Sequence, residues 1–371
     1  MPQRLKVLLL IPHLGGGGAE HVTALLAQNL SRERYDLHLG LVTRPALGAD
    51  AFPPWVSVHA LGASRVRTAT IPLLWLILHL RPDVILSGMA HLNFLVLILR
   101  PFLPRATCVL ARQNATISSA LASGDLPTGT RWLYRTCYPR ADRVICQTHA
   151  MAMDLMNELD MSERHVAVLS NPVDVERLRG AIPKARTHWS GPGPHLLAVG
   201  RLSREKGFDL LLKALSIVRL RFPQTDLVIA GAGPQHTALK AQSEALGLTA
   251  AVRFAGNVDR PEIFFPGASA FVLSSRHEGL PNALLEAAAC GLPIVAVPSS
   301  GGVSDLLEHQ CGTWLAKQIT ADALSATLQS ALEELRPNQR FEHAFVEQFR
   351  IEPAIRAYEG LIDSVRKERI R

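Results

Sequence analysis

Two carboxylates stand eight positions apart in SSRHEGLPNALLEAAACGLPIVA, residues 274–296. Glu278 precedes a Gly-Leu-Pro-Asn corner, and Glu286 follows it in an alanine-rich helical pattern. An ionised carboxylate only accepts hydrogen bonds, so Glu286 suits the two hydroxyls of a ribose and Glu278 suits a second polyhydroxylated group. The alternative is a loop charge at Glu278 and a solvated helix face at Glu286. We favour the functional interpretation, because an apolar, alanine-rich helix gives a carboxylate little structural reason to be there.

The corner itself predicts the start of a helix. Pro281 suits the first turn, and the backbone amides from Gly279 to Ala283 would form a helix N-terminus, which attracts phosphate. The donor-binding residues predicted here are Gly279, Leu280, Pro281 and Asn282.

Two cations occur in VGRLSREKGFDLLL, residues 199–212, on a predicted strand-to-helix loop. Arg201 and Lys206 suit a diphosphate, both for binding and for the negative charge of a leaving group. A solvated basic loop is the alternative. It is weakened because the two carboxylates fall on the same predicted edge of a sheet.

Other polar segments carry weaker signals. The glycines at 15–18 bring the backbone close to a ligand or simply make a tight turn, and no dinucleotide-binding fingerprint follows them. The segment ARQNAT, residues 111–116, is either an acceptor-side cluster or ordinary loop polarity. Its candidate residues are Arg112, Gln113 and Asn114. No His/Cys spacing typical of a metal site occurs, so protein cations and helix dipoles would have to carry the charge of a leaving diphosphate.

The elements that must position these residues alternate between buried-strand and helical patterns. KVLLLIP, a glycine turn and AEHVTALLAQNL open the chain as a parallel α/β unit, and the rhythm restarts at HLLAVG, residue 195. The predicted fold class is therefore α/β, with two doubly wound parallel sheets, one in each of two domains. We expect the domains to cover 1–172 and 173–351, with a C-terminal helix at about 352–371 that packs back on the first. Because parallel sheets bind ligands beyond the carboxyl ends of their strands, we expect the site in a cleft between the sheets.

Composition limits the partners and the compartment. The 371 residues carry a net charge of +7 without the clustered basic and aromatic residues of a nucleic-acid surface, so we expect no nucleic-acid partner. Five cysteines are scattered without a CxxC pair, and the N-terminal apolar run is too short for a signal peptide. A cytoplasmic protein is expected, and no apolar run reaches the roughly 18 residues of a spanning helix.

Together these motifs resemble the retaining GT-B glycosyltransferases of family 4, which use nucleotide-sugar donors. The resemblance covers most of the chain and rests on five segments: the glycine loop at 15–18, NPVD at 171–174, GRLSREKGFDLLL at 200–212, AGAGP at 230–234, and the Glu-x7-Glu stretch that begins at residue 274. The last is the most specific of these motifs.

The resemblance implies a role for each candidate residue. Glu286 would hold the ribose and Glu278 the donor sugar, while Arg201 and Lys206 would neutralise the diphosphate. Amides from Gly279 to Asn282 and from the Gly15–Gly16 turn would assist, and Gly256 and Val258 would meet the base. It also implies a front-face mechanism that keeps the anomeric configuration, so Glu278 need not be a nucleophile. The chain departs from many relatives at Gln113, where they carry a histidine.

The function expected from sequence is transfer of a hexosyl or N-acetylhexosaminyl group from a nucleotide donor. The donor is expected to be a UDP-sugar, and the acceptor a glycan or lipid-linked molecule of surface polysaccharide or lipopolysaccharide synthesis. No metal and no cofactor are expected beyond the donor as co-substrate. A non-catalytic nucleotide-sugar-binding protein remains an alternative. A nicotinamide-dependent dehydrogenase is disfavoured because the glycine loop lacks the required pattern.

Residues 65–105 contain two very apolar helical stretches, each too short to span a bilayer. The stretches are flanked by Arg65, Arg67, Arg81, Arg100 and Arg105. They either cover the first sheet or dock on an anionic inner membrane face that presents a lipid-linked acceptor. We expect peripheral association with the membrane.

Overall fold

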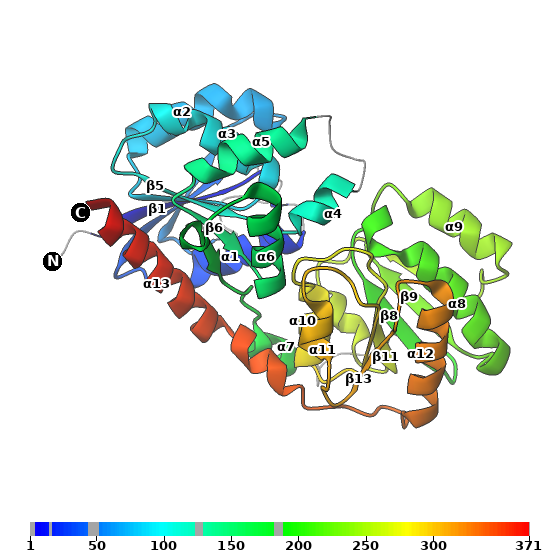
Figure 1. Cartoon of the computed structure of the whole chain (residues 1–371). Helices are drawn as coiled ribbons and strands as arrows, with labels where there is room; N and C mark the ends of the chain where they lie inside the picture. Colours follow the sequence, from blue (N-terminus) through cyan, green and yellow to red (C-terminus); the bar gives the residue numbers. More distant parts are fainter. Residues whose placement is uncertain (1–3, 15–16, 44–51, 123–128, 182–187, 371) are drawn as a thin grey trace. The chain divides into compact units, whose positions relative to one another are not determined.

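The structure is a computed structural model that describes residues 4–14, 17–43, 52–122, 129–181 and 188–370. The described chain forms two compact units, Met1–Pro172 together with Ile351–Arg371, and Val173–Arg350. Each unit contains one parallel sheet with helices on both faces (Figure 1). This confirms the predicted fold class.

The sheet of the first unit has seven strands in the described residues, in the order β3-β2-β1-β4-β5-β6-β7, and all neighbours run parallel. Its strands are β1 (Leu5–Ile11), β2 (Tyr35–Leu41), β3 (Val56–Ala60), β4 (Val84–Ser87), β5 (Cys108–Arg112), β6 (Arg143–Cys146) and β7 (Val166–Val168). Its α-helices are α1 (Gly18–Asn29), α2 (Thr70–Leu80), α3 (Ala90–Leu99), α4 (Ile117–Ala122), α5 (Thr130–Cys137), α6 (His149–Leu159) and α13 (Ile351–Ile370). Short 3-10 turns are η2 (Val66–Ala69), η3 (Arg100–Phe102), η4 (Tyr138–Arg140) and η5 (Glu163–His165).

Strand β1 shows why its sequence is apolar at every position. Leu8 and Leu10 pack on one face of the sheet with α2, α3, α5 and α6, whereas Val7, Leu9 and Ile11 pack on the other with α1 and α13. Alternate side chains of a strand point to opposite faces, so a strand covered on both sides needs a continuous apolar run.

The second unit repeats the design with six strands in the described residues, in the order β10-β9-β8-β11-β12-β13, again all parallel. Its strands are β8 (His195–Val199), β9 (Asp226–Ala230), β10 (Val252–Gly256), β11 (Ala270–Leu273), β12 (Ile294–Ala296) and β13 (Thr313–Leu315). Its α-helices are α7 (Val175–Ala181), α8 (Phe208–Arg221), α9 (His236–Ala245), α10 (Asn282–Ala289), α11 (Val303–Leu307) and α12 (Ala321–Glu334). The 3-10 turns are η7 (Arg204–Lys206), η8 (Pro261–Phe264) and η9 (Ala344–Phe349).

The helices of the second unit are divided between the faces of its sheet. Helices α8, α9 and α12 share one apolar cluster with the sheet, and α7, α10 and α11 share the other. The strand β13 is not among the strands expected from sequence. Helix α10 begins at Asn282, one residue after the proline that was expected in its first turn.

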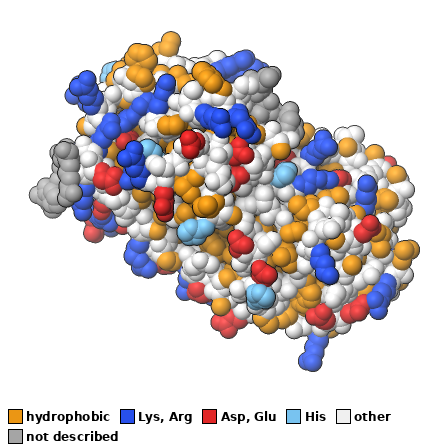
Figure 2. Space-filling model, viewed as in Figure 1, with side chains coloured by type: hydrophobic (Ala, Val, Ile, Leu, Met, Phe, Trp, Pro, Cys, Tyr) orange, Lys and Arg blue, Asp and Glu red, His pale blue; other side chains and the backbone are white. Residues whose placement is uncertain are grey.

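Helices α2 and α3 of the first unit carry apolar side chains both in the core and on the surface. Leu73, Leu76 and Ile77 of α2 are buried, yet Ile71 and Trp75 are 81% and 60% exposed. Figure 2 shows hydrophobic side chains along the upper edge of the view, over α2 and α3, with arginine and lysine side chains on either side. Within the described ranges, no helix combines the length and apolarity needed to cross a bilayer.

Candidate active site

The second sheet has its switch point between β8 and β11, which are neighbours although β9 and β10 separate them in the chain. The helices that follow these strands, α8 and α10, pack on opposite faces of the sheet. In open parallel sheets, ligands bind beyond the carboxyl ends of the strands at this point. Arg201 and Lys206 follow β8, and Glu278 and Glu286 follow β11, so all four predicted charges flank the switch point.

Lys206 and Glu278 are in direct contact. The Lys206 Nζ donates to Oε1 of Glu278 at 2.8 Å and to Oε2 at 3.0 Å. The Glu278 side chain is only 7% exposed and that of Lys206 is 26% exposed. A carboxylate this buried requires a paired cation, so the site holds its charges at fixed positions before any ligand arrives.

Hydrogen bonds tie the loop after β8 to the loop after β11. The Ser274 hydroxyl donates to the Lys206 carbonyl at 2.9 Å, and the Arg276 amide donates to the Glu205 carbonyl at 2.7 Å. The Arg276 guanidinium also donates to both carboxylate oxygens of Asp209 at 2.7 Å. Burial alone would raise the pKa of Asp209, but these bonds from Arg276 hold it below its usual value. The base of α8 is thereby fixed to the segment that carries Glu278.

Two glycines allow the backbone of these loops to approach closely. A Cβ on Gly207 would lie 2.0 Å from the Ser274 carbonyl oxygen, and one on Gly301 would lie 2.3 Å from that of Glu278. Both residues also have a positive φ, 64° and 87°. Only glycine meets both demands without strain, so these residues set the spacing of the loops that carry Lys206 and Glu278.

Glu286 has a very different environment from Glu278. It lies on α10, is partly buried, and its carboxylate makes no hydrogen bond or ion pair with any described residue. Burial, with a smaller contribution from the nearby Glu262 carboxylate, raises the pKa of Glu286 to about 7, although Arg177 acts in the opposite direction. Partial burial without a partner is costly for a carboxylate, which favours a functional reason for its presence.

The remaining donor-side residues lie at the same carboxyl edge of the second sheet. Arg201 is exposed, and its side chain makes no hydrogen bond or ion pair with the described residues. Gly256 ends β10, has a φ of 71°, and accepts a hydrogen bond from the Gly231 amide at 2.7 Å. Val258 follows two residues later in the loop before η8. Gly279 and Leu280 are buried ahead of α10. Pro281 stands at its N-cap, where it has no N–H to donate.

The acceptor-side candidates lie at the carboxyl end of β5 in the first unit, and each makes side-chain hydrogen bonds there. Arg112 is 1% exposed and donates to Oδ1 of Asn114 at 2.6 Å and to Oδ1 of Asn171. Gln113 accepts from the Tyr138 hydroxyl at 2.6 Å and donates to the Ala115 carbonyl at 2.9 Å. These bonds stabilise the loop after β5. Gly15 and Gly16 lie outside the described residues.

Two residues beside Glu286 are missing from the sequence-based set. Glu262 of η8 is 5% exposed and accepts a hydrogen bond from Arg177 of α7 at 2.5 Å. No spacing rule connects residues 177, 262 and 286, because the packing of three separate elements brings them together. The sequence offered one signal for Glu262. It is an acidic residue in the loop after a predicted strand, and that strand precedes the Glu-x7-Glu stretch.

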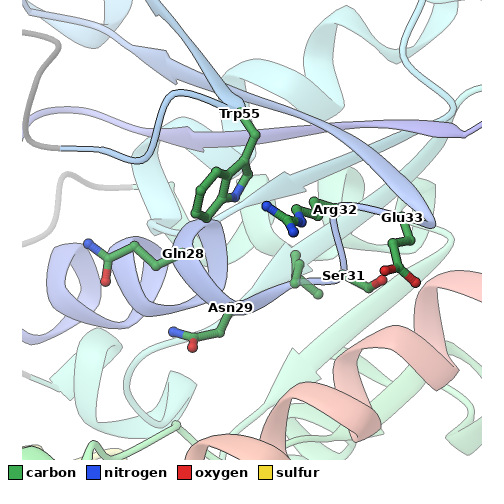
Figure 3. Close-up of a pocket in the computed structure, with 7 residues that line it drawn as sticks. Gln28, Asn29, Ser31, Arg32, Glu33 and Trp55 are labelled. Carbon is green, nitrogen blue, oxygen red and sulfur yellow. The ribbon is translucent and has the colours of Figure 1, made fainter.

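A cavity of about 330 Å³ lies in the first unit (Figure 3). Trp55 and Arg32 line it, together with Gln28, Asn29, Leu30, Ser31 and Glu33. Trp55 directly precedes β3, and residues 31–33 precede β2, so the cavity lies at the amino ends of parallel strands. Ligand sites of such sheets form at the carboxyl ends.

Two doubly wound parallel sheets, one in each unit, are the architecture of the GT-B class of glycosyltransferases. Comparison with protein families supports this class. Residues 16–177 match the family described as "Glycosyltransferase Family 4", and residues 184–346 match "Glycosyl transferases group 1". The chain belongs to the group 1 and family 4 glycosyltransferases, a retaining family.

Individual relatives agree with this assignment. The chain is 29% identical over 204 residues to the lipopolysaccharide core biosynthesis glycosyltransferase LpsE of Rhizobium meliloti, which covers 55% of this chain and 56% of LpsE. It is 24% identical over 340 residues, 89% of this chain and 90% of the relative, to a Campylobacter jejuni enzyme. That enzyme is named N-acetylgalactosamine-N,N'-diacetylbacillosaminyl-diphospho-undecaprenol 4-alpha-N-acetylgalactosaminyltransferase. The chain spans about a third to about half of the length of other curated relatives that it matches.

A solved structure shares the fold across the whole chain. HepE of Anabaena, crystallised in complex with UDP, superimposes with a TM-score of 0.72 at 19% sequence identity. The match covers 97% of this chain and 100% of HepE. At this identity the likeness establishes the GT-B fold.

Proposed function

We propose that the chain transfers a sugar with retention and without a metal ion. The donor is a nucleoside-diphosphate sugar, most simply a UDP-hexose or UDP-N-acetylhexosamine, and the acceptor is a glycan or lipid-linked molecule of surface polysaccharide synthesis. The observation that carries this proposal is the contact between Lys206 and Glu278 at the switch point of the second sheet, where α10, which carries Glu286, also begins.

Each charged residue has a role that fits its environment. Arg201 and Lys206 bind the diphosphate and neutralise the charge that develops when it leaves. Glu278, held by Lys206, accepts hydrogen bonds from the donor sugar, and Glu286 accepts them from the ribose hydroxyls. Gly256 and Val258 meet the base, and amides of Gly279, Leu280 and Asn282 assist with phosphate. Pro281 shapes the turn rather than donating.

The proposed transfer step is the front-face mechanism that the resemblance to the family implies. The bond between the anomeric carbon and the β-phosphate oxygen breaks, and the nucleoside diphosphate leaves with the electron pair. The acceptor hydroxyl oxygen attacks the same face of the sugar, and its proton passes to the departing phosphate. No covalent sugar–enzyme bond forms, so Glu278 acts by stabilising positive charge on the sugar.

The acceptor side is proposed to lie in the first unit. Arg112, Gln113 and Asn114 order the loop after β5 and present it to the acceptor, with Gln113 where many relatives have a histidine. A lipid-linked acceptor is supported by the undecaprenol-linked substrate in the name of the Campylobacter jejuni relative. A lipopolysaccharide acceptor is supported by the name of LpsE.

A membrane-docking surface is proposed on the first unit, from the exposed side chains of α2, η3 and α5. Ile71 and Trp75 of α2 are joined by Phe102 and Trp132, which are 65% and 68% exposed. The exposed arginines near α2 and η3 are Arg65, Arg67, Arg81 and Arg105. Arg100 does not belong to this rim, because its side chain is 13% exposed and paired with Asp142 at 3.0 Å. Apolar side chains with a basic rim suit an anionic leaflet at the inner membrane face, where the protein would act from the cytoplasm.

A ligand panel tests the donor proposal. Purified protein is heated with UDP- and GDP-sugars, and the melting temperature is recorded for wild type and for Lys206→Ala. A bound donor at 100 times its Kd stabilises the folded state by about 2.7 kcal/mol, so one donor class should raise the melting temperature in wild type. The increase should shrink in Lys206→Ala. Failure of every nucleotide sugar to stabilise wild type would contradict the proposal.

A further inference from the structure

A buried carboxylate with two guanidinium partners lies next to the proposed ribose site. Oε1 of Glu262 accepts from Nη1 of Arg177 at 2.5 Å and from Nε of Arg260 at 3.1 Å. The Glu262 side chain is 6% exposed, whereas those of Arg177 and Arg260 are 41% and 62% exposed. Burial alone would raise the pKa of Glu262, but the hydrogen bonds from the arginines hold it below its usual value. Glu262 is therefore ionised.

Helix α7, which carries Arg177, is fixed against α10, which carries Glu286. Arg179 of α7 donates to the carbonyl of Ala289, the last residue of α10, at 3.1 Å. Glu262 and Arg177 are the charged neighbours whose fields act on the Glu286 carboxyl, in opposite directions. Both act through a partly buried environment, where charges are screened less than in water.

The other charged and titratable groups around α10 have different partners. Arg179 pairs with Glu347 of η9 at 3.1 Å, and His343 before η9 bonds the Leu292 carbonyl at 2.8 Å. Cys290 follows α10, and burial raises the pKa of its thiol to about 12, so it stays neutral. The neighbouring strands β11 and β12 carry no titratable side chain.

We propose that Arg177 and Glu262 are positioning residues of the donor site, which together set the charge of Glu286 and thereby the strength with which the ribose is held. The inference rests on the proposed function, because it takes Glu286 as the ribose ligand. An ionised carboxylate can accept hydrogen bonds from both ribose hydroxyls, whereas the neutral acid has lost part of that capacity. Glu262 disfavours the ionised form and Arg177 favours it, so nucleotide binding is coupled to release of a proton from Glu286.

The test is the pH dependence of nucleotide affinity. The Kd of UDP, and of GDP as a second probe with the same ribose, is measured by calorimetry from pH 5.5 to 9. Glu286→Gln serves as the reference, since its pH profile contains the titration of the phosphates but not of the carboxyl. A group with a pKa near 7 goes from about a tenth to about nine tenths ionised between pH 6 and 8. Relative to Glu286→Gln, wild-type affinity should rise by up to about tenfold over that range.

Two substitutions should move the midpoint of this profile in opposite directions. Glu262→Gln removes a negative neighbour and should move the midpoint to lower pH. Arg177→Met removes a positive neighbour and should move it to higher pH, while Arg177→Lys should restore it. Arg221→Met is the control, because Arg221 of α8 is an exposed arginine paired with Glu333 and its charge is not among those that act on Glu286. Its midpoint should equal that of wild type.

The outcomes separate this inference from the proposed function. If wild type binds neither UDP nor GDP, the proposed function fails. If it binds them but the two midpoints stay in place, move together, or move equally in Arg221→Met, the positioning role of Arg177 and Glu262 is overturned. Melting curves confirm that each variant is folded. If Arg177→Met does not fold, Arg177→Lys keeps the test valid.

Discussion

Glu278 and Glu286 show how two identical side chains acquire different properties from their surroundings. Glu278 is buried but paired, with both oxygens within 3.0 Å of the Lys206 ammonium. Glu286 is partly buried and unpaired, and its pKa rises to about 7. Glu278 therefore forms a fixed charge pair with Lys206, whereas the Glu286 carboxyl is available to bind a ligand.

The unpaired carboxyl predicts a pH-dependent cost to the stability of the unliganded protein. The pKa of Glu286 rises from 4.5 unfolded to about 7 folded, so the folded state keeps a proton that the unfolded state loses between these values. Stability should therefore fall as pH rises through this window. Glu286→Gln should raise the free energy of unfolding by up to about 3 kcal/mol at pH 8, and the gain should vanish below about pH 4.5. Urea unfolding from pH 4 to 8.5 measures this, and a gain that does not change with pH would contradict it.

The two carboxylates should also separate in binding and catalysis. Glu286→Ala should weaken nucleotide binding by about 1.5–3 kcal/mol, the range for hydrogen bonds to a charged group. Glu278→Ala should instead reduce turnover more than nucleotide affinity, because its partner is the reacting sugar. Calorimetry with the nucleoside diphosphate and steady-state kinetics with the sugar donor measure the two effects. Unchanged nucleotide affinity in Glu286→Ala would show that Glu286 does not bind the ribose.

At the scale of elements, the site depends on how closely the loops after β8, β11 and β12 approach one another. Gly301, after β12, has a φ of 87°, and a Cβ there would lie 2.3 Å from the Glu278 carbonyl and 2.6 Å from that of Gly279. The backbone of the loop after β11 therefore occupies the space that any other residue would need.

This packing predicts a large difference between two glycines with similar backbones. Gly301→Ala must displace the segment that carries Glu278, so nucleotide affinity and turnover should both fall. Gly247 has a φ of 68° but nothing within 4 Å of its ideal Cβ position, so Gly247→Ala isolates the cost of the backbone conformation, about 1–2 kcal/mol. Melting temperature, Kd and kcat are compared for both variants. Equal effects would show that the close approach at Gly301 has no bearing on the site.

The repeated strand–loop–helix pattern made most of the elements predictable from sequence. KVLLLIP and HLLAVG are apolar at nearly every position because both faces of their strands are covered, and the glycine-containing loops after them marked the carboxyl edge. The strand β13 was missed because Thr313–Leu315 lacks the β-branched aliphatic residues that marked the equally short edge strand β7. Arg177 and Glu262 were missed because only tertiary packing brings α7 and η8 to Glu286. Contact between Lys206 and Glu278 was likewise beyond sequence reasoning, which placed them only on the same edge.

At the scale of the whole molecule, the proposed function assigns donor chemistry to the second unit and membrane docking to the apolar surface of the first. The exposed side chains of Ile71 and Trp75 project from a helix whose other face is already buried in the core. Such exposure is costly in a protein that meets only water, which supports docking on a lipid surface.

Vesicle sedimentation measures this docking. Binding should increase with the fraction of anionic lipid and decrease with salt, since each basic residue near the surface contributes about 1 kcal/mol. Neutralising Arg65, Arg67 and Arg105 together, or changing Trp75→Ala with Trp132→Ala, should weaken binding. Leu220→Ala is the matched control, because Leu220 is an 86% exposed apolar residue of α8 in the other unit. Protein that stays in the supernatant with strongly anionic vesicles at low salt would contradict the docking surface and favour a soluble acceptor.

The most direct test of the account is release of nucleoside diphosphate from a panel of UDP- and GDP-sugars in the presence of a chelator. The switch point of the second sheet is proposed to neutralise the leaving diphosphate with Arg201 and Lys206. We therefore expect wild type to release the nucleoside diphosphate from one donor class, with water or added acceptor, at the same rate with and without chelator. Lys206→Ala and Glu278→Gln should lose most of this activity while remaining folded. The account would be contradicted if no donor yields nucleoside diphosphate, if Lys206→Ala retains full turnover, or if chelation abolishes release and added magnesium or manganese restores it.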